Sequence, residues 1–135
     1  MNNLVNSIKT MSESFFEEIK IYRRHLHQHP ELSFKEYQTA DFIESKLREM
    51  GIENIQRIAK TGITFLLEGS SEGKNIALRA DIDALPIFEK SQLDYRSKYD
   101  GIMHACGHDV HTSCLLGVAK ILNQLKSEFK GSVKF

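Results

Sequence analysis

The stretch NIALRADI, residues 75–82, carries the main information about the fold of this chain. It begins with nearly continuous apolar residues, and its end is abruptly charged at Arg79 and Asp81, with Asp83 directly after it. An apolar run of this length is expected for an interior strand of a covered sheet. Two further runs, IQRIAK (55–60) and GITFLLEGS (62–70), have strand length and precede it. The middle of the chain is therefore predicted to form a sheet.

Helical periodicity precedes these strands. Residues 4–30 place apolar side chains near helical spacing, and Pro30 ends the pattern because the residue before a proline is pushed out of the helical region. Residues 33–51 are predicted to form a second helix. Ser33 and Glu36 resemble a capping box at its start, and Gly51 follows as a C-terminal stop.

A long loop and a third helix follow the strands. Residues 84–108 contain Pro, Gly and polar residues and are predicted to form a loop, which at this length is usually functional or disordered. Residues 109–129 carry apolar residues at helical spacing and are predicted to form the third helix. GSVKF (131–135) is predicted to begin another strand. The order helix, helix, strands, loop, helix, strand predicts an α/β fold with helices flanking a mixed sheet.

Composition limits the classes of function. The chain has 135 residues, which fits one domain, with 18 Lys plus Arg against 18 Asp plus Glu. No long basic block occurs, which argues against nucleic acid or an anionic membrane as partner. No apolar run reaches the roughly 20 residues that span a bilayer. The N-terminus lacks the layout of a signal peptide, so a cytoplasmic protein is expected.

Metal-binding side chains gather in IMHACGHDVHTS, residues 102–113. Cys106 and His108 lie two residues apart, and a thiolate and an imidazole are good ligands for zinc, while imidazole also suits manganese, cobalt or nickel. Asp109 could hold an imidazole in the required tautomer, and His104 and His111 are further candidates. The alternative is a polar turn before a helix, with Cys106 as a small buried residue and Asp109 as its N-cap. The spacing alone leaves both open.

Asp81 and Asp83 form a second polar cluster at the end of a predicted strand. In open α/β sheets, ligands gather beyond the carboxyl ends of strands, and carboxylates there can bind metal, orient a metal-bound histidine or transfer a proton. The alternative is an ordinary polar strand end in which Arg79 pairs with Asp81.

A third cluster, HLHQHPEL, places His25, His27 and His29 at spacing two. Residues i and i+2 of a helix do not share a face. We therefore expect a helix C-terminus whose histidines face the helix dipole and water, not a metal tract.

Taken together, these stretches resemble the N-terminal part of the M20 metallopeptidase family. The resemblance runs from about Ile21 to Phe135 and rests on residues 23–51, TGI (61–63), ALRADIDALPI (77–87) and MHACGHDVHT (103–112). It is greatest for the branch of amidohydrolases that act on N-acyl amino acids, such as hippurate hydrolases. The family implies a catalytic domain with a sheet flanked by helices, a smaller inserted lid domain, and a site for two divalent ions (Zn, Mn, Co or Ni).

The resemblance also implies roles for individual residues. Cys106 and His108 match the first two metal ligands of this branch. For Asp81 and Asp83 the transfer stays open: one alignment puts Asp81 at a histidine ligand position and Asp83 at the orienting aspartate, and another makes Asp81 the catalytic aspartate.

The resemblance further implies that functional parts lie beyond these residues. In the family, a strand like GSVKF leads to two glutamates, a general base and a metal ligand, and the lid follows later. Residues 1–135 are thus expected to be the N-terminal portion of a catalytic domain without its lid, inactive or nearly so by itself.

Two functions are expected from these arguments. The first is metal-dependent hydrolysis of small N-acyl amino acids by the complete enzyme. The second is a non-catalytic structural or interaction module, in which the exposed sheet edge allows homo-oligomerisation.

Overall fold

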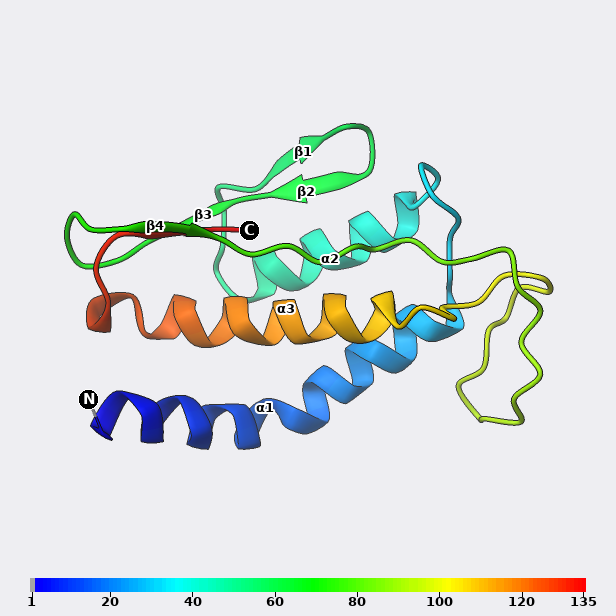
Figure 1. The fold of residues 1–135 in the computed structure, drawn as a ribbon, viewed down its shortest axis with the longest axis horizontal. Helices are drawn as coiled ribbons and strands as arrows, with labels where there is room; N and C mark the ends of the chain where they lie inside the picture. The colour runs from blue at the N-terminus through cyan, green and yellow to red at the C-terminus, as the bar shows by residue number, and fades with distance from the viewer. Residues whose placement is uncertain (1) are drawn as a thin grey trace.

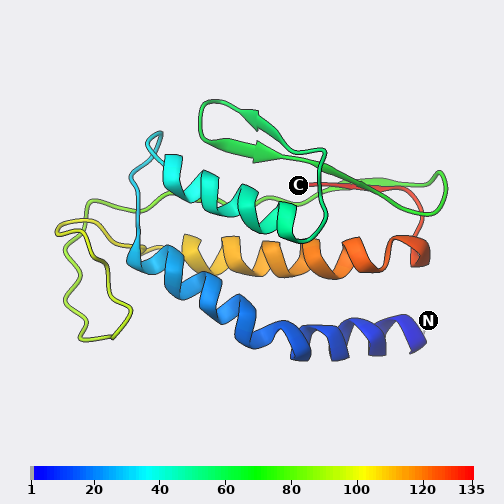
Figure 2. The same ribbon diagram turned by 180° about the vertical axis from the view of Figure 1, so that it is seen from behind.

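The computed structural model describes residues 2–135, without the side chain of Asn2, and confirms the predicted α/β class (Figure 1). In both views the strands form one layer and the helices lie on one side of it, with α1 farthest from the strands (Figures 1 and 2). None of the helices within residues 2–135 is long and apolar enough to cross a membrane. The elements are α1 Asn2–Gln28, α2 Tyr37–Glu49, β1 Gln56–Ile58, β2 Gly62–Thr64, β3 Leu66–Glu68, β4 Asn75–Ala77, α3 His108–Gln124, a 3-10 turn Lys126–Glu128 and β5 Ser132–Lys134.

Helices α1 and α3 pack against each other along their lengths (Figure 1). Leu26 of α1 is buried, and α1 ends at Gln28, before Pro30, as the sequence predicts. Gly117 of α3 allows the close approach, since a Cβ added there would lie 3.3 Å from Ile19 on α1.

The start of α2 differs from the sequence prediction. The helix begins after Glu36, which makes no side-chain capping hydrogen bond, so the predicted capping box with Ser33 is wrong. The carboxylate of Glu31 instead pairs with the backbone amides in the first turn of α2. It accepts hydrogen bonds from the backbone amides of Gln38 at 3.2 Å and Thr39 at 2.7 Å. A cap from outside the helix needs tertiary approach, which a local motif does not encode.

The main sheet is mixed, with strand order β3-β5-β4. β5 pairs antiparallel with β3 and parallel with β4, and β1 and β2 form a separate antiparallel hairpin. The prediction of an interior strand over NIALRADI is wrong in this structure. Within residues 2–135, β4 covers only Asn75–Ala77 and lies at the sheet edge with Ile76 54% exposed, because its one partner is β5.

The core lies between the strands and the helices. Its buried members are Tyr22, Ile43, Leu47, Ile52, Phe65, Leu67, Leu116 and Ala119. Burial of these side chains provides the main stabilising free energy and holds α3 against the sheet.

Two segments beyond the regular elements bring the polar clusters together. Residues 78–83 continue from β4 without regular secondary structure and pass beside α3 (Figure 1), where the hydroxyl of Thr112 donates to the carbonyl of Asp81 at 3.0 Å. The predicted loop over residues 84–108 is confirmed up to residue 107, since α3 begins at His108, and the Leu85–Met103 bridge closes its base. The loop thus leaves and returns at the same end of α3.

Candidate metal centre

The Cys106–His108 segment lies at the N-terminus of α3. Gly107 takes a left-handed conformation with φ +82° at the N-cap position, and His108 is the first residue of the helix. This turn leaves Cys106 exposed in the loop and His108 partly buried beside it. The free thiol of Cys106 is therefore accessible as a ligand, and the reading of Cys106 as a small buried residue is wrong.

His108 is held by Asp83. Its Nδ1 lies 2.9 Å from the Oδ1 of Asp83 and 3.0 Å from the backbone carbonyl oxygen of the same residue. Both partners are hydrogen-bond acceptors, so Nδ1 carries the proton and donates it. Nε2 then presents its lone pair, which is the tautomer that a metal ligand needs.

Asp81 has a different environment from Asp83. Its carboxylate accepts from the Nη2 of Arg79, in an ion pair that is largely exposed. Within residues 2–135, Asp83 is the carboxylate within ion-pair distance of His108. The geometry therefore favours Asp83 as the orienting aspartate, while the catalytic assignment of Asp81 and Asp83 stays a prediction.

The remaining histidines of this segment are separate from the Asp83–His108 pair. His111 is exposed, and its ring centroid lies 6.0 Å from that of His108. His104 is buried, and both of its ring nitrogens lack a hydrogen-bond partner among the described residues. Burial lowers the pKa of His104, which keeps its imidazole neutral.

The donor chemistry fits part of a divalent metal shell. Cys106 offers an accessible thiol and His108 an oriented Nε2, the donor types that zinc and cobalt favour. In the part of the chain that the structure describes, no group of three or more His, Cys, Asp and Glu side chains is arranged to hold a metal ion. A catalytic metal usually has three or more protein ligands, so these two residues fit as part of a site that needs further donors.

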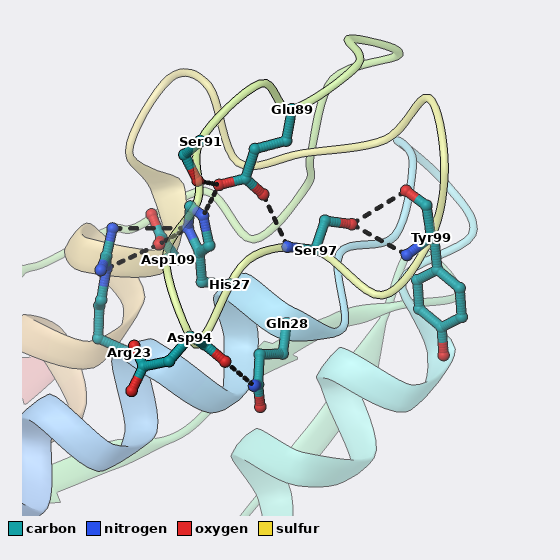
Figure 3. Close-up of polar contacts among 9 residues, drawn as sticks. All are labelled: Arg23, His27, Gln28, Glu89, Ser91, Asp94, Ser97, Tyr99 and Asp109. Atoms are coloured by element: carbon teal, nitrogen blue, oxygen red, sulfur yellow. Dashed lines mark hydrogen bonds and ion pairs between the residues drawn. The ribbon is translucent and has the colours of Figure 1, made fainter.

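A buried polar network lies behind this segment and includes His27 (Figure 3). The Nδ1 of His27 lies 2.7 Å from the Oδ2 of Asp109, and its Nε2 lies 3.1 Å from the Oε1 of Glu89. The Nε of Arg23 is 3.0 Å from the same Asp109 oxygen. His27, Glu89 and Asp109 are all at least 95% buried. His27 and the partly exposed Arg23 thus face two buried carboxylates.

The network perturbs the acid–base properties of its members. The hydrogen bond to Asp109, with that to Glu89, outweighs burial and raises the pKa of His27. Burial alone would raise the pKa of Glu89. Hydrogen bonds from the Ser91 hydroxyl, the Ser97 amide and His27 outweigh it and lower that pKa to about 2. The ion-paired forms are therefore favoured near neutral pH.

The sequence predictions for these histidines are only partly correct. His25 and His29 are near the end of α1, where His29 Nδ1 donates to the carbonyl of His25 at 2.8 Å. The prediction that His27 faces water is wrong, because its side chain is 4% exposed and contacts Asp109. Asp109 lies in the first turn of α3, so the reading of Asp109 as the N-cap is also wrong. The i,i+4 pair of Arg23 and His27 was a weak local signal for this network.

Known proteins resemble this chain in sequence. The profile described as peptidase family M20/M25/M40 matches residues 77–135. Over 135 residues the chain is 44% identical to an N-acyl-L-amino acid amidohydrolase of Geobacillus stearothermophilus, covering 100% of this chain and 35% of the relative. It is 54% identical over 112 residues to an N-acetyl-L-cysteine deacetylase of Bacillus subtilis, covering 83% of this chain and 27% of the relative.

A solved structure shows the same fold. The crystal structure of the Bacillus subtilis YXEP protein, described as a dinuclear metal binding peptidase from the M20 family, superposes with a TM-score of 0.86 at 48% identity. The match covers 91% of this chain and 35% of that one, so the chain spans about a third of the length of the proteins it matches. The resemblance to the M20/M25/M40 peptidase family seen in the sequence is confirmed: its profile matches residues 77–135, and the similarity to the amidohydrolase relative and to the solved M20 peptidase structure extends over 91–100% of this chain.

Proposed function

We propose that the protein of which these residues form part hydrolyses the amide bond of N-acyl amino acids with the help of divalent metal ions. The observation that carries the proposal is the Asp83–His108 hydrogen bond, which presents His108 Nε2 beside the accessible thiol of Cys106. The relatives named as an N-acyl-L-amino acid amidohydrolase and an N-acetyl-L-cysteine deacetylase support small N-acyl amino acids as the substrate class.

The chain's own residues supply binding and orientation. Asp83 accepts the Nδ1 proton of His108, which leaves the Nε2 lone pair to face a ligand. Cys106 and His108 would hold a divalent ion such as Zn, Mn, Co or Ni, which would supply polarisation of the amide carbonyl and a lower pKa for the attacking water. Products of this reaction are a carboxylic acid and a free amino acid.

The general base and the other ligands are expected outside residues 1–135. Asp83, the carboxylate beside His108, is already engaged by that imidazole. We therefore propose that the 135-residue chain by itself does not turn over substrate. Efficient hydrolysis of N-acetyl or N-benzoyl amino acids by the purified chain with added Mn²⁺, Co²⁺ or Zn²⁺ would refute this part.

Cobalt binding tests the site without relying on activity. Co²⁺ added to the chain should give a thiolate-to-cobalt charge-transfer band. Cys106→Ser should abolish the band, and Cys114→Ser, which removes an exposed thiol on α3, should leave it unchanged. A band that survives in Cys106→Ser and disappears in Cys114→Ser would contradict the proposed site.

A second candidate function, an interaction module, is supported by the open edge of β4. Within residues 2–135, β4 pairs only with β5, and Ile76 on it is 54% exposed. Exposed edges of this kind pair with other chains. We propose a second copy of the chain as its partner. Sedimentation should show a dimer that Ile76→Lys dissociates, and a monomer at high concentration would contradict this candidate.

A further inference from the structure

His27 connects three segments of the chain that meet at the metal-binding loop. It comes from the last turn of α1, contacts Asp109 in the first turn of α3, and contacts Glu89 in the loop over residues 84–107 (Figure 3). Asp109 directly follows His108. The side chain that fixes Asp109 therefore also fixes the start of the helix that carries His108.

Glu89 holds the loop in the same network. Its carboxylate accepts from the Ser91 hydroxyl at 2.6 Å and from the Ser97 amide at 2.7 Å, in addition to His27. The loop begins directly after Asp83 and ends at the residues before His108. Anchoring it at Glu89 restrains both sides of the Asp83–His108 hydrogen bond.

The hydrogen-bond partners define the state of the His27 ring. The carboxylates of Asp109 and Glu89 both accept, so both ring nitrogens donate. With Arg23 beside Asp109, the cluster pairs two cations with two anions; His27, Glu89 and Asp109 are buried, and the side chain of Arg23 is 28% exposed. A charge-balanced cluster of this kind is disrupted when one member is removed, because the opposite charge is left buried and unpaired.

We propose that His27, held between Glu89 and Asp109, is a positioning residue for the metal ligands: it fixes the first turn of α3 so that His108 meets Asp83 and Cys106 faces the same ion. The inference rests on the proposed metal site. It assigns a role to a side chain in α1 whose polar partners within residues 2–135 are Arg23, Asp109 and Glu89, and not His108 or Cys106. Residues that orient metal ligands typically change metal affinity on the order of 10- to 100-fold when substituted.

The first test needs no metal. Long-range ¹H–¹⁵N NMR spectra of the 135-residue chain report which ring nitrogen of His108 carries the proton. The unmodified chain should show a single tautomer protonated at Nδ1. His27→Gln should give a mixture of tautomers, while His25→Gln, an exposed histidine in the same last turn of α1, should retain the single tautomer.

The second test uses Co²⁺ alone. At a temperature where circular dichroism shows equal helix content, His27→Gln should bind Co²⁺ at least about tenfold more weakly than the unmodified chain, and His25→Gln should bind equally well. If His27→Gln does not fold, Glu89→Gln, which keeps the size of the side chain, takes its place with the same expected results. A folded variant with the tautomer and the Co²⁺ affinity of the unmodified chain overturns the inference.

The two tests separate this inference from the proposed function. If the unmodified chain gives no thiolate-to-cobalt band, but His27→Gln still changes the His108 tautomer, the metal site is wrong and the positioning role stands. If the band is present, but His27→Gln changes neither the His108 tautomer nor the Co²⁺ affinity, the metal site stands and the positioning role is wrong.

Discussion

Replacement of Glu89 by Gln should destabilise the chain in a manner that depends on pH. Glu89 is 5% exposed and accepts hydrogen bonds from Ser91, Ser97 and His27. These bonds lower its pKa from the ordinary 4.5 to about 2. Glutamine keeps the size of the side chain but removes the negative charge that these donors stabilise.

The magnitude follows from the pKa. A depression from 4.5 to about 2 corresponds to about 3 kcal/mol in favour of the folded state, at 1.36 kcal/mol for each tenfold change in proton affinity. The amide oxygen of glutamine can still accept part of these hydrogen bonds, so about 1–2 kcal/mol is the expected loss in the free energy of unfolding.

The sign of the pH dependence is defined by the direction of the shift. Because the folded pKa is depressed, the stabilisation is fully present above pH 4.5 and is lost as the pH falls toward about 2. His27 acts in the opposite sense. Its raised pKa gives a contribution that is complete below its ordinary 6.5 and is lost as the pH rises through the folded value. The stabilising contributions of Glu89 and His27 are therefore both complete between pH 4.5 and pH 6.5.

Urea unfolding followed by circular dichroism measures the effect. At pH 5.5, Glu89→Gln should unfold at a lower urea concentration than the unmodified chain, and the difference should shrink steadily from pH 4.5 to pH 3. Glu72→Gln, an exposed glutamate in the turn before β4, is the control and should change little at any pH. A difference for Glu89→Gln that is equal at pH 5.5 and pH 3, or absent at both, would refute the reasoning.

Three further predictions concern the candidate site and the core. Asp83→Asn should weaken Co²⁺ binding on the order of 10- to 100-fold, because His108 is then no longer held in the tautomer protonated at Nδ1. Asp81→Asn should weaken it much less. Equal losses of Co²⁺ affinity in the two variants would contradict the assignment of Asp83 as the orienting aspartate. Leu47→Ala, at a core position that is 1% exposed, should cost roughly 2–5 kcal/mol in the free energy of unfolding, measured by urea titration. Gly131→Ala should also be strongly destabilising by the same measurement, because φ is +83° and the added Cβ would lie 1.9 Å from a backbone carbonyl oxygen.

The sequence predicted helix ends, the long loop and the last strand well, because these features depend on neighbouring residues. Apolar spacing, Pro30 and Gly51 identified the helices and their ends, and Gly51 does adopt a positive φ of 78°. The loop predicted over residues 84–108 was correct to within one residue, and the strand at GSVKF was also predicted correctly. Each depends on steric preferences of neighbouring residues, which the sequence encodes directly.

Predictions that depended on distant partners were less successful. NIALRADI has the composition of an interior strand, but whether a strand is interior depends on the strands beside it, and within residues 2–135 β4 has one. The motif of Ser33 and Glu36 resembles a cap, but Glu31 reaches the first turn of α2 instead. Which side chain accepts hydrogen bonds from the first turn of α2 depends on how the chain turns before that helix.

The sequence by itself determined the α/β class and the resemblance to the M20 family, and it predicted Cys106 and His108 as metal ligands, because residue type and spacing carry that information. Only the tertiary structure decided which aspartate faces His108. Asp81 and Asp83 are equivalent in type and lie two residues apart, yet Arg79 pairs with the first and the start of α3 meets the second. The tertiary structure also converted His27 from an expected surface residue into the buried partner of Asp109, 82 residues away. A pairing over that separation is defined by helix packing, which brings α1 and α3 together and is not visible in any local stretch of the chain.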